Sequence, residues 1–199
     1  MIKNIIFDVG RVLVEVNWLQ VMKDLGFDGE TLERVSKATV FSPAWLEYDA
    51  SVLPYEELLK KFIANDPEMK EQILLFMEHE QDAIREFSYA NEWVKSFKDK
   101  GYGCYILSNY PKRTFEISMG ERSFEEHMDG AIYSWQVKVS KPNREIYEIL
   151  LDRYGLKAEE CLFMDDTARN LEVAKEFGIH TILFTDKEKA EEELKKIGI

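Results

Sequence analysis

The sequence lacks most features of secreted, membrane-spanning and metal-thiolate proteins. It has only two cysteines, Cys104 and Cys161, which show no metal-ligand spacing and lie in apolar runs. We therefore expect both to be buried, reduced thiols. No apolar run approaches the roughly 20 residues needed to cross a bilayer, and residues 1–4 do not resemble a signal peptide. These absences predict a cytoplasmic protein without a membrane partner.

Positive charge is also scarce. The chain has 26 lysines and arginines against 38 aspartates and glutamates, and its net charge is −12 at pH 7. Such a surface repels the phosphate backbone of nucleic acids, so we expect no nucleic-acid partner. The same charge opposes any anionic substrate. A phosphate site in this chain would therefore need its own positive field, from a metal ion, a lysine or helix N-termini.

What the sequence does contain is an alternation of apolar runs and helical patterns. Short apolar runs suit the strands of a parallel sheet buried on both faces, and each helical pattern between them ends just before a glycine. The alternation predicts a doubly wound α/β fold with a parallel sheet and helices on both faces. The expected strands are residues 5–7, 105–107, 131–133, 162–164 and 181–184, and the expected helices are residues 91–100, 144–154 and 167–177, with a charged, solvated surface helix at 187–196.

Residues 17–87 interrupt this alternation. They carry helical patterns but no strand-like run, so we expect a helical insertion after the first strand. The α/β core would then consist of residues 1–16 and 88–199. The expected helices of the insertion are residues 18–25, 30–37, 55–64 and 67–85.

The insertion is rich in aromatic residues. At helical spacing, most of them are expected to lie in a core. Trp45 and Tyr48 lie near Ser42 and Pro43 in a stretch that is poor in helical pattern. We expect these two rings to be the exceptions, and to stack on a sugar or an aromatic leaving group.

Polar residues follow four of the predicted strands, directly after three of them and past a short connection after the other. In doubly wound sheets, ligands bind outside the carboxyl ends of the strands, so we expect these residues to meet at one edge. Each of them alone reads as an ordinary turn, capping or loop residue, and only their conjunction points to a site. They are Asp8, Gly10 and Arg11 after the first strand, Ser108 and Asn109 after the second, Lys141 after the third, and Asp165 and Asp166 after the fourth.

Three of these residues are carboxylates. Asp8, Asp165 and Asp166 would lie too close together to stay ionised without a cation between them. Hard oxygen ligands of this kind suit Mg²⁺, which takes one or two carboxylates together with waters and phosphate oxygens. The donors after the second and third strands are suited to holding phosphoryl oxygens, and a carboxylate can attack phosphorus to form an aspartyl-phosphate. We therefore predict a Mg²⁺ cofactor and a small phosphorylated metabolite as the ligand.

With these residues in place, the chain resembles the haloacid dehalogenase superfamily, in its phosphatase-rich branch with a helical cap after the first strand. The resemblance covers essentially the whole chain, and it implies a Rossmann-like core with residues 17–87 as the cap that selects the substrate. It rests on four motifs: Phe7-Asp8-Val9-Gly10-Arg11-Val12-Leu13, Leu107-Ser108-Asn109, Ser140-Lys141-Pro142, and Phe163-Met164-Asp165-Asp166 continuing to Asn170.

The resemblance also implies a role for each motif residue. The expected reaction is hydrolysis of a phosphomonoester through an aspartyl-phosphate. The implied roles are Asp8 as nucleophile; Asp8, the Gly10 carbonyl, Asp165 and Asp166 as Mg²⁺ ligands; Lys141 as a catalytic and phosphate-binding residue; and Ser108 and Asn109 as further substrate contacts. The position of Arg11 directly after Gly10 makes it a further candidate for substrate binding, facing the phosphate or the cap, with a surface ion pair as the alternative.

One position departs from the family pattern. The family usually has an aspartate two residues after the nucleophile, which acts as general acid and base, and here that residue is Gly10. General acid–base catalysis is typically worth about 10²–10⁴-fold in rate. The pattern Asp-Val-Gly-Arg-Val is similar to that of a subgroup with Asp-Leu-Gly-Asn-Val, which resembles a bacterial glucose-1-phosphate phosphatase. A sugar phosphate is therefore one expected substrate, and Glu15 or a cap residue is the expected replacement for the missing acid.

Two other functions stay open from the sequence. Gly10 is compatible with a protein that binds phosphate or a sugar phosphate with weak turnover or none. A haloacid dehalogenase would also use Asp8 as its nucleophile, but it needs no divalent cation. The paired acids Asp165 and Asp166 argue against a dehalogenase, because uncompensated carboxylates beside the nucleophile would repel an anionic haloacid.

Overall fold

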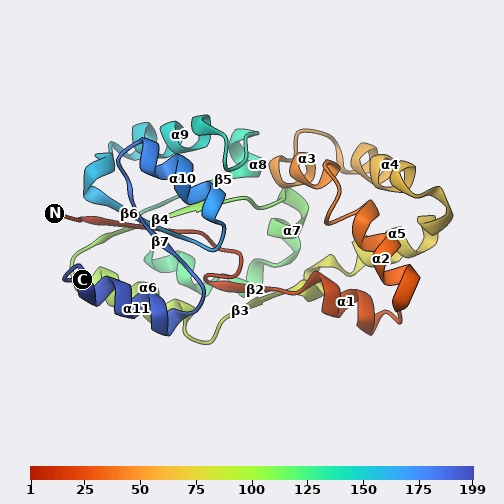
Figure 1. Cartoon of the computed structure of the whole chain (residues 1–199), viewed down its shortest axis with the longest axis horizontal. Coiled ribbons are helices and arrows are strands. Elements are labelled where there is room, and N and C mark those ends of the chain that lie inside the picture. Colours follow the sequence, from red (N-terminus) through yellow and green to blue (C-terminus); the bar gives the residue numbers. More distant parts are fainter.

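The central feature of the molecule is a five-stranded sheet in which all strands are parallel. The computed structural model describes all residues, 1–199, and Figure 1 shows the sheet in the half of the molecule that holds both termini. The strand order is β5-β4-β1-β6-β7, so β1 is central and the chain reverses its direction of winding between β5 and β6. The strands are β1 (Asn4–Phe7), β4 (Gly103–Ser108), β5 (Gly130–Tyr133), β6 (Cys161–Asp165) and β7 (His180–Leu183). The predicted fold class is confirmed.

Helices cover both faces of this sheet (Figure 1). Successive side chains of β1 point to opposite faces, because side chains alternate along a strand. Phe7 packs edge-on against Trp93 and Phe97, with ring centroids 5.8 and 5.7 Å away, whereas Ile6 joins the cluster on the other face that contains Tyr147. The first face is covered by α6 (Ala90–Asp99) and α11 (Lys187–Lys196), and the second by α9 (Arg144–Tyr154) and α10 (Ala168–Glu176).

The predicted helices of the core are present, with ends shifted by at most one residue. The last helix, α11, is more than the solvated surface helix expected from its charge. Its Ala190 and Leu194 are buried and pack into the core on the α6 face. The remaining short elements of the core are α7 (Lys112–Ile117), α8 (Ser134–Val137) and three 3₁₀ turns, Met119–Glu121, Ser123–His127 and Ala158–Glu160.

Helices α1 to α5, which lie between β1 and α6 in the chain, form the other half of the molecule (Figure 1). The buried apolar side chains of this half, from Val21 to Ala83, make a hydrophobic cluster separate from the two clusters on the sheet. We propose that residues 17–87 are a cap domain on a core of residues 1–16 and 88–199. The helices of this insertion are α1 (Trp18–Asp24), α2 (Gly29–Ala38), α3 (Ala44–Ala50), α4 (Tyr55–Asn65) and α5 (Lys70–Glu78).

A two-stranded antiparallel sheet joins the insertion to the core. It consists of β2 (Val14–Val16) and β3 (Ile84–Glu86), with Val14 opposite Glu86 and Val16 opposite Ile84. The expectation of a strand-free insertion with one helix over residues 67–85 is therefore wrong. A helical pattern of apolar residues cannot reveal so short a strand, because its partner lies far earlier in the chain. The expected helix is instead split into 3₁₀ turns at Pro67–Met69 and Glu80–Ala83 on either side of α5, followed by β3.

The stretch after Ser42, expected to be poor in helix, contains α3. Pro43 directly precedes this helix with a φ of −57°. Proline fixes φ near the helical value and needs no hydrogen-bond acceptor, so it is well suited to the start of a helix. The proline therefore marks a helix start here and not a loop.

Both cysteines are buried and unpaired, as expected. Burial raises the pKa of the Cys104 thiol to about 12 and that of Cys161 to about 11. Both thiols are therefore protonated at neutral pH and are poor nucleophiles. None of the helices combines the length and the apolar character needed to pass through a membrane.

Candidate active site

The carboxyl ends of β1, β4 and β6 bring the predicted residues together. Phe7 of β1 is opposite Ile106 of β4 and Met164 of β6, so these three strands end almost level. Asp8 follows β1, while Ser108 and Asp165 are the last residues of β4 and β6. This edge lies at the point where the winding of the sheet reverses, which is where open α/β sheets bind their ligands.

Asp8 is nearly buried and is held by one of its two carboxylate oxygens. The exposed fraction of the residue is 8%. The Oδ1 atom accepts a hydrogen bond from the Val9 backbone N–H at 2.7 Å and lies 3.0 Å from Lys141 Nζ. The Oδ2 atom accepts no hydrogen bond from the protein, and the residue lines an open pocket. Burial raises the pKa of Asp8 above its ordinary range, the charge of Lys141 opposes this, and the nearby Asp165 and Asp166 add to it.

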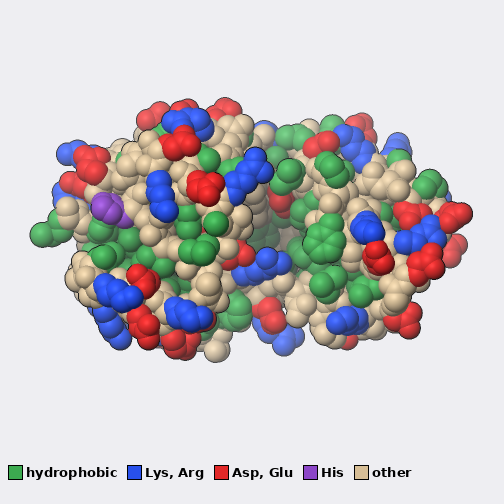
Figure 2. Space-filling model, in the orientation of Figure 1, with side chains coloured by type: hydrophobic (Ala, Val, Ile, Leu, Met, Phe, Trp, Pro, Cys, Tyr) green, Lys and Arg blue, Asp and Glu red, His purple; other side chains and the backbone are tan.

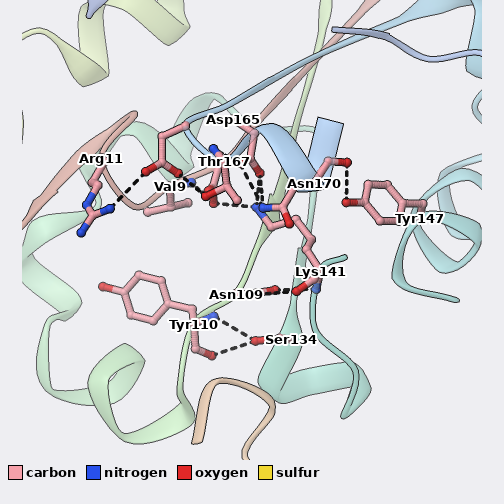
Figure 3. A network of polar contacts seen from close by, with 12 residues as sticks. Val9, Arg11, Asn109, Tyr110, Ser134, Lys141, Tyr147, Asp165, Thr167 and Asn170 are labelled. Atoms are coloured by element: carbon pink, nitrogen blue, oxygen red, sulfur yellow. Dashed lines mark hydrogen bonds and ion pairs between the residues drawn. The ribbon is translucent and has the colours of Figure 1, made fainter. Parts of the chain in front are cut away.

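Lys141 is the cation of the site and is 2% exposed. Its Nζ lies between two carboxylates, 3.0 Å from Asp8 Oδ1 and 2.7 Å from Asp165 Oδ2. Figure 3 shows its backbone held by Asn109, whose Oδ1 accepts from the Lys141 N–H at 2.7 Å while Nδ2 donates to the Lys141 carbonyl at 3.0 Å. Asn109 therefore positions Lys141, a role that the sequence did not reveal. Its contact with phosphate stays a prediction.

The two aspartates after β6 have different surroundings. Asp165 is fully buried, and in addition to Lys141 it accepts hydrogen bonds from the Thr167 N–H at 2.7 Å and from Asn170 Nδ2 at 3.0 Å (Figure 3). Asp166 has a partly exposed side chain that lines the pocket. The carboxylate oxygens of Asp165 thus already have partners within the protein, whereas Asp166 lines the space where a ligand would bind.

One carboxylate oxygen from each of Asp8, Asp165 and Asp166 lies within 4.8 Å of the other two. Gly10 lines the same pocket. Two pocket-lining carboxylates, with the Gly10 backbone beside them and room for water and phosphate oxygens, fit the octahedral, oxygen-only preference of Mg²⁺. The donor set is therefore suited to this ion, with Asp8 and Asp166 as the more accessible ligands and Asp165 behind them.

Ser108 and Arg11 are also placed beside this cluster. Ser108 is fully buried, and its Oγ has no hydrogen-bond partner. Buried hydroxyls are nearly always paired, so an unpaired one at the end of β4 is suited to meeting an oxygen of a ligand. Arg11 is exposed, has a left-handed φ of 59°, and its Nη1 lies 3.4 Å from Asp166 Oδ2. Both Arg11 and Asp166 line the pocket.

The pocket is formed by both halves of the molecule. Its volume is about 230 Å³, and Figure 2 shows a hollow between the two halves. The insertion contributes Trp18, Trp45 and Asp49, opposite the core residues. A cavity of this size and mixed polarity suits a small molecule. Trp45 lies at the pocket as predicted.

Two sequence expectations about this pocket are wrong. Tyr48 is 3% exposed, and its hydroxyl donates to Glu80 inside the insertion, so the ring cannot stack on a ligand. Glu15 is exposed on the face of β2 opposite Val16, and Val16 is the residue of that strand that lines the pocket. Because side chains alternate along a strand, Glu15 points away from the site and cannot replace the missing acid.

Asp49 is a pocket residue that no sequence motif singles out. It lies on α3 of the insertion, and its carboxyl group lines the pocket without a hydrogen-bond or ion-pair partner in the protein. Burial raises the pKa of Asp49 to about 8; the charge of Asp8 adds to this rise and Lys141 opposes it. Local sequence cannot mark this residue, because only the packing of the insertion on the core brings it to the site.

A second buried carboxyl, Glu80, lies at the junction of the two halves and is expected to make stability depend on pH. Burial raises its pKa to about 7 from 4.5, while hydrogen bonding from Tyr48 and the charge of Arg113 oppose the rise. The folded protein therefore keeps the proton between about pH 5 and 7, where the unfolded chain loses it, and the unfolding free energy falls as pH rises through this window. Relative to Glu80→Gln, the native protein should lose on the order of 2 kcal/mol between about pH 5 and pH 8.

Urea unfolding of both proteins at the two pH values measures this difference. Glu78→Gln removes an exposed carboxyl at the end of the neighbouring helix α5 and is the matched control. A difference between native protein and Glu80→Gln that stays constant with pH would contradict the prediction.

Comparison with known proteins gives relatives over the whole chain. A family model for haloacid dehalogenase-like hydrolase matches residues 2–178. D-ribitol-5-phosphate phosphatase of Bacteroides thetaiotaomicron is 28% identical over 197 residues, and the match covers 91% of each chain. Acyl-CoA dehydrogenase family member 10 of Mus musculus is 26% identical over 218 residues. The chain spans only 19% of that mouse protein, and no more than 37% of several other curated relatives.

Solved structures agree on the fold. The crystal structure of a haloacid dehalogenase (HAD) family enzyme from Bacteroides thetaiotaomicron, in a magnesium complex, matches with a TM-score of 0.74 at 22% identity and covers 94% of both chains. This likeness extends over the sheet and the insertion alike. Since the family model covers residues 2–178 and the strand-end residues converge as the motifs predicted, the chain belongs to the haloacid dehalogenase-like hydrolase family.

Proposed function

We propose that the chain is a Mg²⁺-dependent phosphatase that hydrolyses a small phosphomonoester through an aspartyl-phosphate on Asp8. The observation that carries the proposal is the arrangement of Asp8 and Asp166 at one pocket, with the buried Lys141 in contact with Asp8. The Asp8 carboxylate has one oxygen fixed by Lys141 and Val9, while the other has no partner in the protein and is free to attack a ligand in the pocket that Asp8 lines. The curated relative from Bacteroides, a phosphatase, supports the same reaction class.

The residues have distinct tasks in this reaction. The Oδ2 atom of Asp8 attacks phosphorus, and the P–O bond to the leaving group breaks. Lys141 beside Asp8 reduces the repulsion between the carboxylate and the anionic phosphoryl group, and the unpaired Ser108 hydroxyl donates to a phosphoryl oxygen. Mg²⁺ held by Asp8, the Gly10 carbonyl and Asp166, with Asp165 behind them, would neutralise further negative charge.

The raised pKa of Asp8 supports the need for a cation. A nucleophile must be ionised, yet burial and the neighbouring acids favour its protonated form. Lys141 compensates only part of this, since it is shared with Asp165. A divalent cation between Asp8 and Asp166 would restore the charged nucleophile.

The insertion supplies the part of the pocket that would contact the leaving group. Trp18 and Trp45 line it with ring centroids 5.3 Å apart, edge to face. An aromatic wall of this kind suits the carbon face of a sugar or polyol, and two curated relatives are named for D-ribitol 5-phosphate and for phosphorylated carbohydrates. Sugar and polyol phosphates are therefore the substrates to test first.

The proposal is tested by phosphate release from a panel of esters, with Mg²⁺ or with a chelator. The panel holds sugar 1-phosphates, sugar 6-phosphates, D-ribitol 5-phosphate, nucleoside monophosphates and an aryl phosphate. We expect turnover that requires Mg²⁺ and favours the polyol and sugar esters. Equal turnover in the chelator would rule out the metal, and binding of phosphate without any turnover would favour a binding protein.

A further inference from the structure

Gly10 leaves the proposed phosphatase without a proton donor next to the nucleophile. An alkoxide leaving group is a poor one unless it is protonated as the P–O bond breaks. The glycine is not required by packing, because a Cβ at this position would lie 3.5 Å from Val16 Cγ2, an ordinary contact. Glu15 points away from the pocket. A donor must therefore come from another element that reaches the pocket.

Asp49 meets this requirement. The pocket is lined by three carboxyl groups, and two of them, Asp8 and Asp166, belong to the proposed nucleophile and metal site. The third is Asp49, on the insertion side, where the leaving group of a phosphoryl ester bound at Asp8 would point. Its carboxyl has no partner within the protein, so both oxygens are free to meet a ligand. Its position is half-buried, which favours the neutral, proton-bearing form of a carboxyl.

The backbone around Asp49 is fixed to the core. Ser134 donates a hydrogen bond to the Asp49 carbonyl and accepts one from the Tyr110 N–H at 2.9 Å (Figure 3). Ser51, two residues on, accepts from the Lys112 N–H at 2.9 Å and from Lys138 Nζ at 2.6 Å. These contacts hold the end of α3 against the loops that follow β4 and β5. The Asp49 carboxyl is therefore placed by rigid elements, as a catalytic group requires.

We propose that Asp49 is the general acid and base of this enzyme, an assignment that rests on the proposed phosphatase function. In the first step Asp8 Oδ2 bonds to phosphorus, the bond from phosphorus to the ester oxygen breaks, and the Asp49 carboxyl gives its proton to that oxygen. The products are a free alcohol, the aspartyl-phosphate and an Asp49 carboxylate. In the second step that carboxylate takes a proton from water as the water oxygen attacks phosphorus. The bond to Asp8 breaks, inorganic phosphate leaves, and both aspartates return to their starting forms.

The test compares esters whose leaving groups differ in their need for a proton. Dinitrophenyl, para-nitrophenyl and phenyl phosphate form a series of rising leaving-group basicity. Asp49→Asn should lower kcat/KM for phenyl phosphate by about 10²–10⁴-fold and that for dinitrophenyl phosphate far less. Dinitrophenyl phosphate should also give a burst of dinitrophenol close to one per enzyme, because the Asn variant forms the aspartyl-phosphate but hydrolyses it slowly.

The ratio of kcat/KM for dinitrophenyl phosphate to kcat/KM for phenyl phosphate is measured on one preparation. An unfolded fraction lowers both values equally and does not alter this ratio. Asp49→Glu should keep this ratio near the native value. Glu47→Gln removes another carboxyl from α3, which pairs with Lys61 outside the pocket, and should leave all rates unchanged. Equal losses on both esters, or none, would overturn the role of Asp49. Absence of Mg²⁺-dependent turnover in the native enzyme would instead overturn the phosphatase itself.

Discussion

Asp8→Asn is expected to lower Mg²⁺-dependent phosphate release by at least about 10³-fold, the scale of loss seen when a nucleophile is removed. Asparagine keeps the shape of the side chain but has no charged oxygen to attack phosphorus. It also removes one of the pocket-facing carboxylates that would hold the metal. Turnover of the best ester, measured with saturating Mg²⁺, gives the size of the loss.

A second measurement on the same two proteins identifies the intermediate. Acid quenching of native enzyme during turnover should leave a phosphoryl group on the peptide that contains residue 8, detectable by mass spectrometry, and the Asn variant should show none. Asp28→Asn, which removes an exposed carboxylate at the start of α2, is the control and should match native enzyme. Retention of turnover by Asp8→Asn would place the nucleophile elsewhere.

Lys141→Met is expected to damage both catalysis and stability. Lys141 is the only cation that contacts the buried Asp8 and Asp165 carboxylates, at 3.0 and 2.7 Å. Breaking a buried ion pair on one side leaves uncompensated charge and costs about 3–5 kcal/mol in typical proteins. Here protonation of a carboxylate can relieve part of that cost, so the loss should be larger at high pH than at low pH.

Urea unfolding with a chelator present measures the loss of stability, and turnover measures the loss of catalysis, which we expect to be about 10²–10³-fold. Added Mg²⁺ should recover part of the stability, because a cation held by this group of aspartates would offset part of the charge that Lys141 no longer balances. Lys95→Met, which breaks an exposed ion pair with Asp99 on α6, is the matched control. A Lys141→Met protein with native stability in the chelator would show that Asp8 and Asp165 are not both charged in the fold.

The sequence was informative where structure is determined locally. Strands such as β1 and β6 are short apolar runs buried on both faces, and a polar residue directly after such a run must lie at the sheet edge. Asp8, Ser108 and Asp165 could therefore be placed together from the sequence alone. The family motifs suggested a chemical role for each of these residues, but they did not predict which atoms of the protein each residue contacts. Asn109, expected to touch phosphate, uses both polar atoms of its side chain to hold the Lys141 backbone.

The insertion was less predictable because its arrangement depends on contacts between distant segments. β3 is a strand only because β2 lies beside it. Tyr48 and Trp45 have similar sequence surroundings, yet one ring is buried against Glu80 and the other lines the pocket. Asp49 is held at the site by the hydrogen bond from Ser134 to its carbonyl, a contact between residues 85 positions apart. No window of neighbouring residues contains this information.

The paired strands β2 and β3 determine where the insertion leaves and rejoins the core. Neighbouring strands lie about 4.8 Å apart, so the chain leaves the core at Val16 and returns at Ile84 almost at the same point. For the sheet, the whole insertion is equivalent to a hairpin turn. The entropy of closing such a loop grows only with the logarithm of its length. A change in the length of this segment should therefore cost the core little conformational entropy. Asp8, Lys141, Asp165 and Asp166 lie outside the segment and would keep their places, whereas Asp49 lies within it and would change with it.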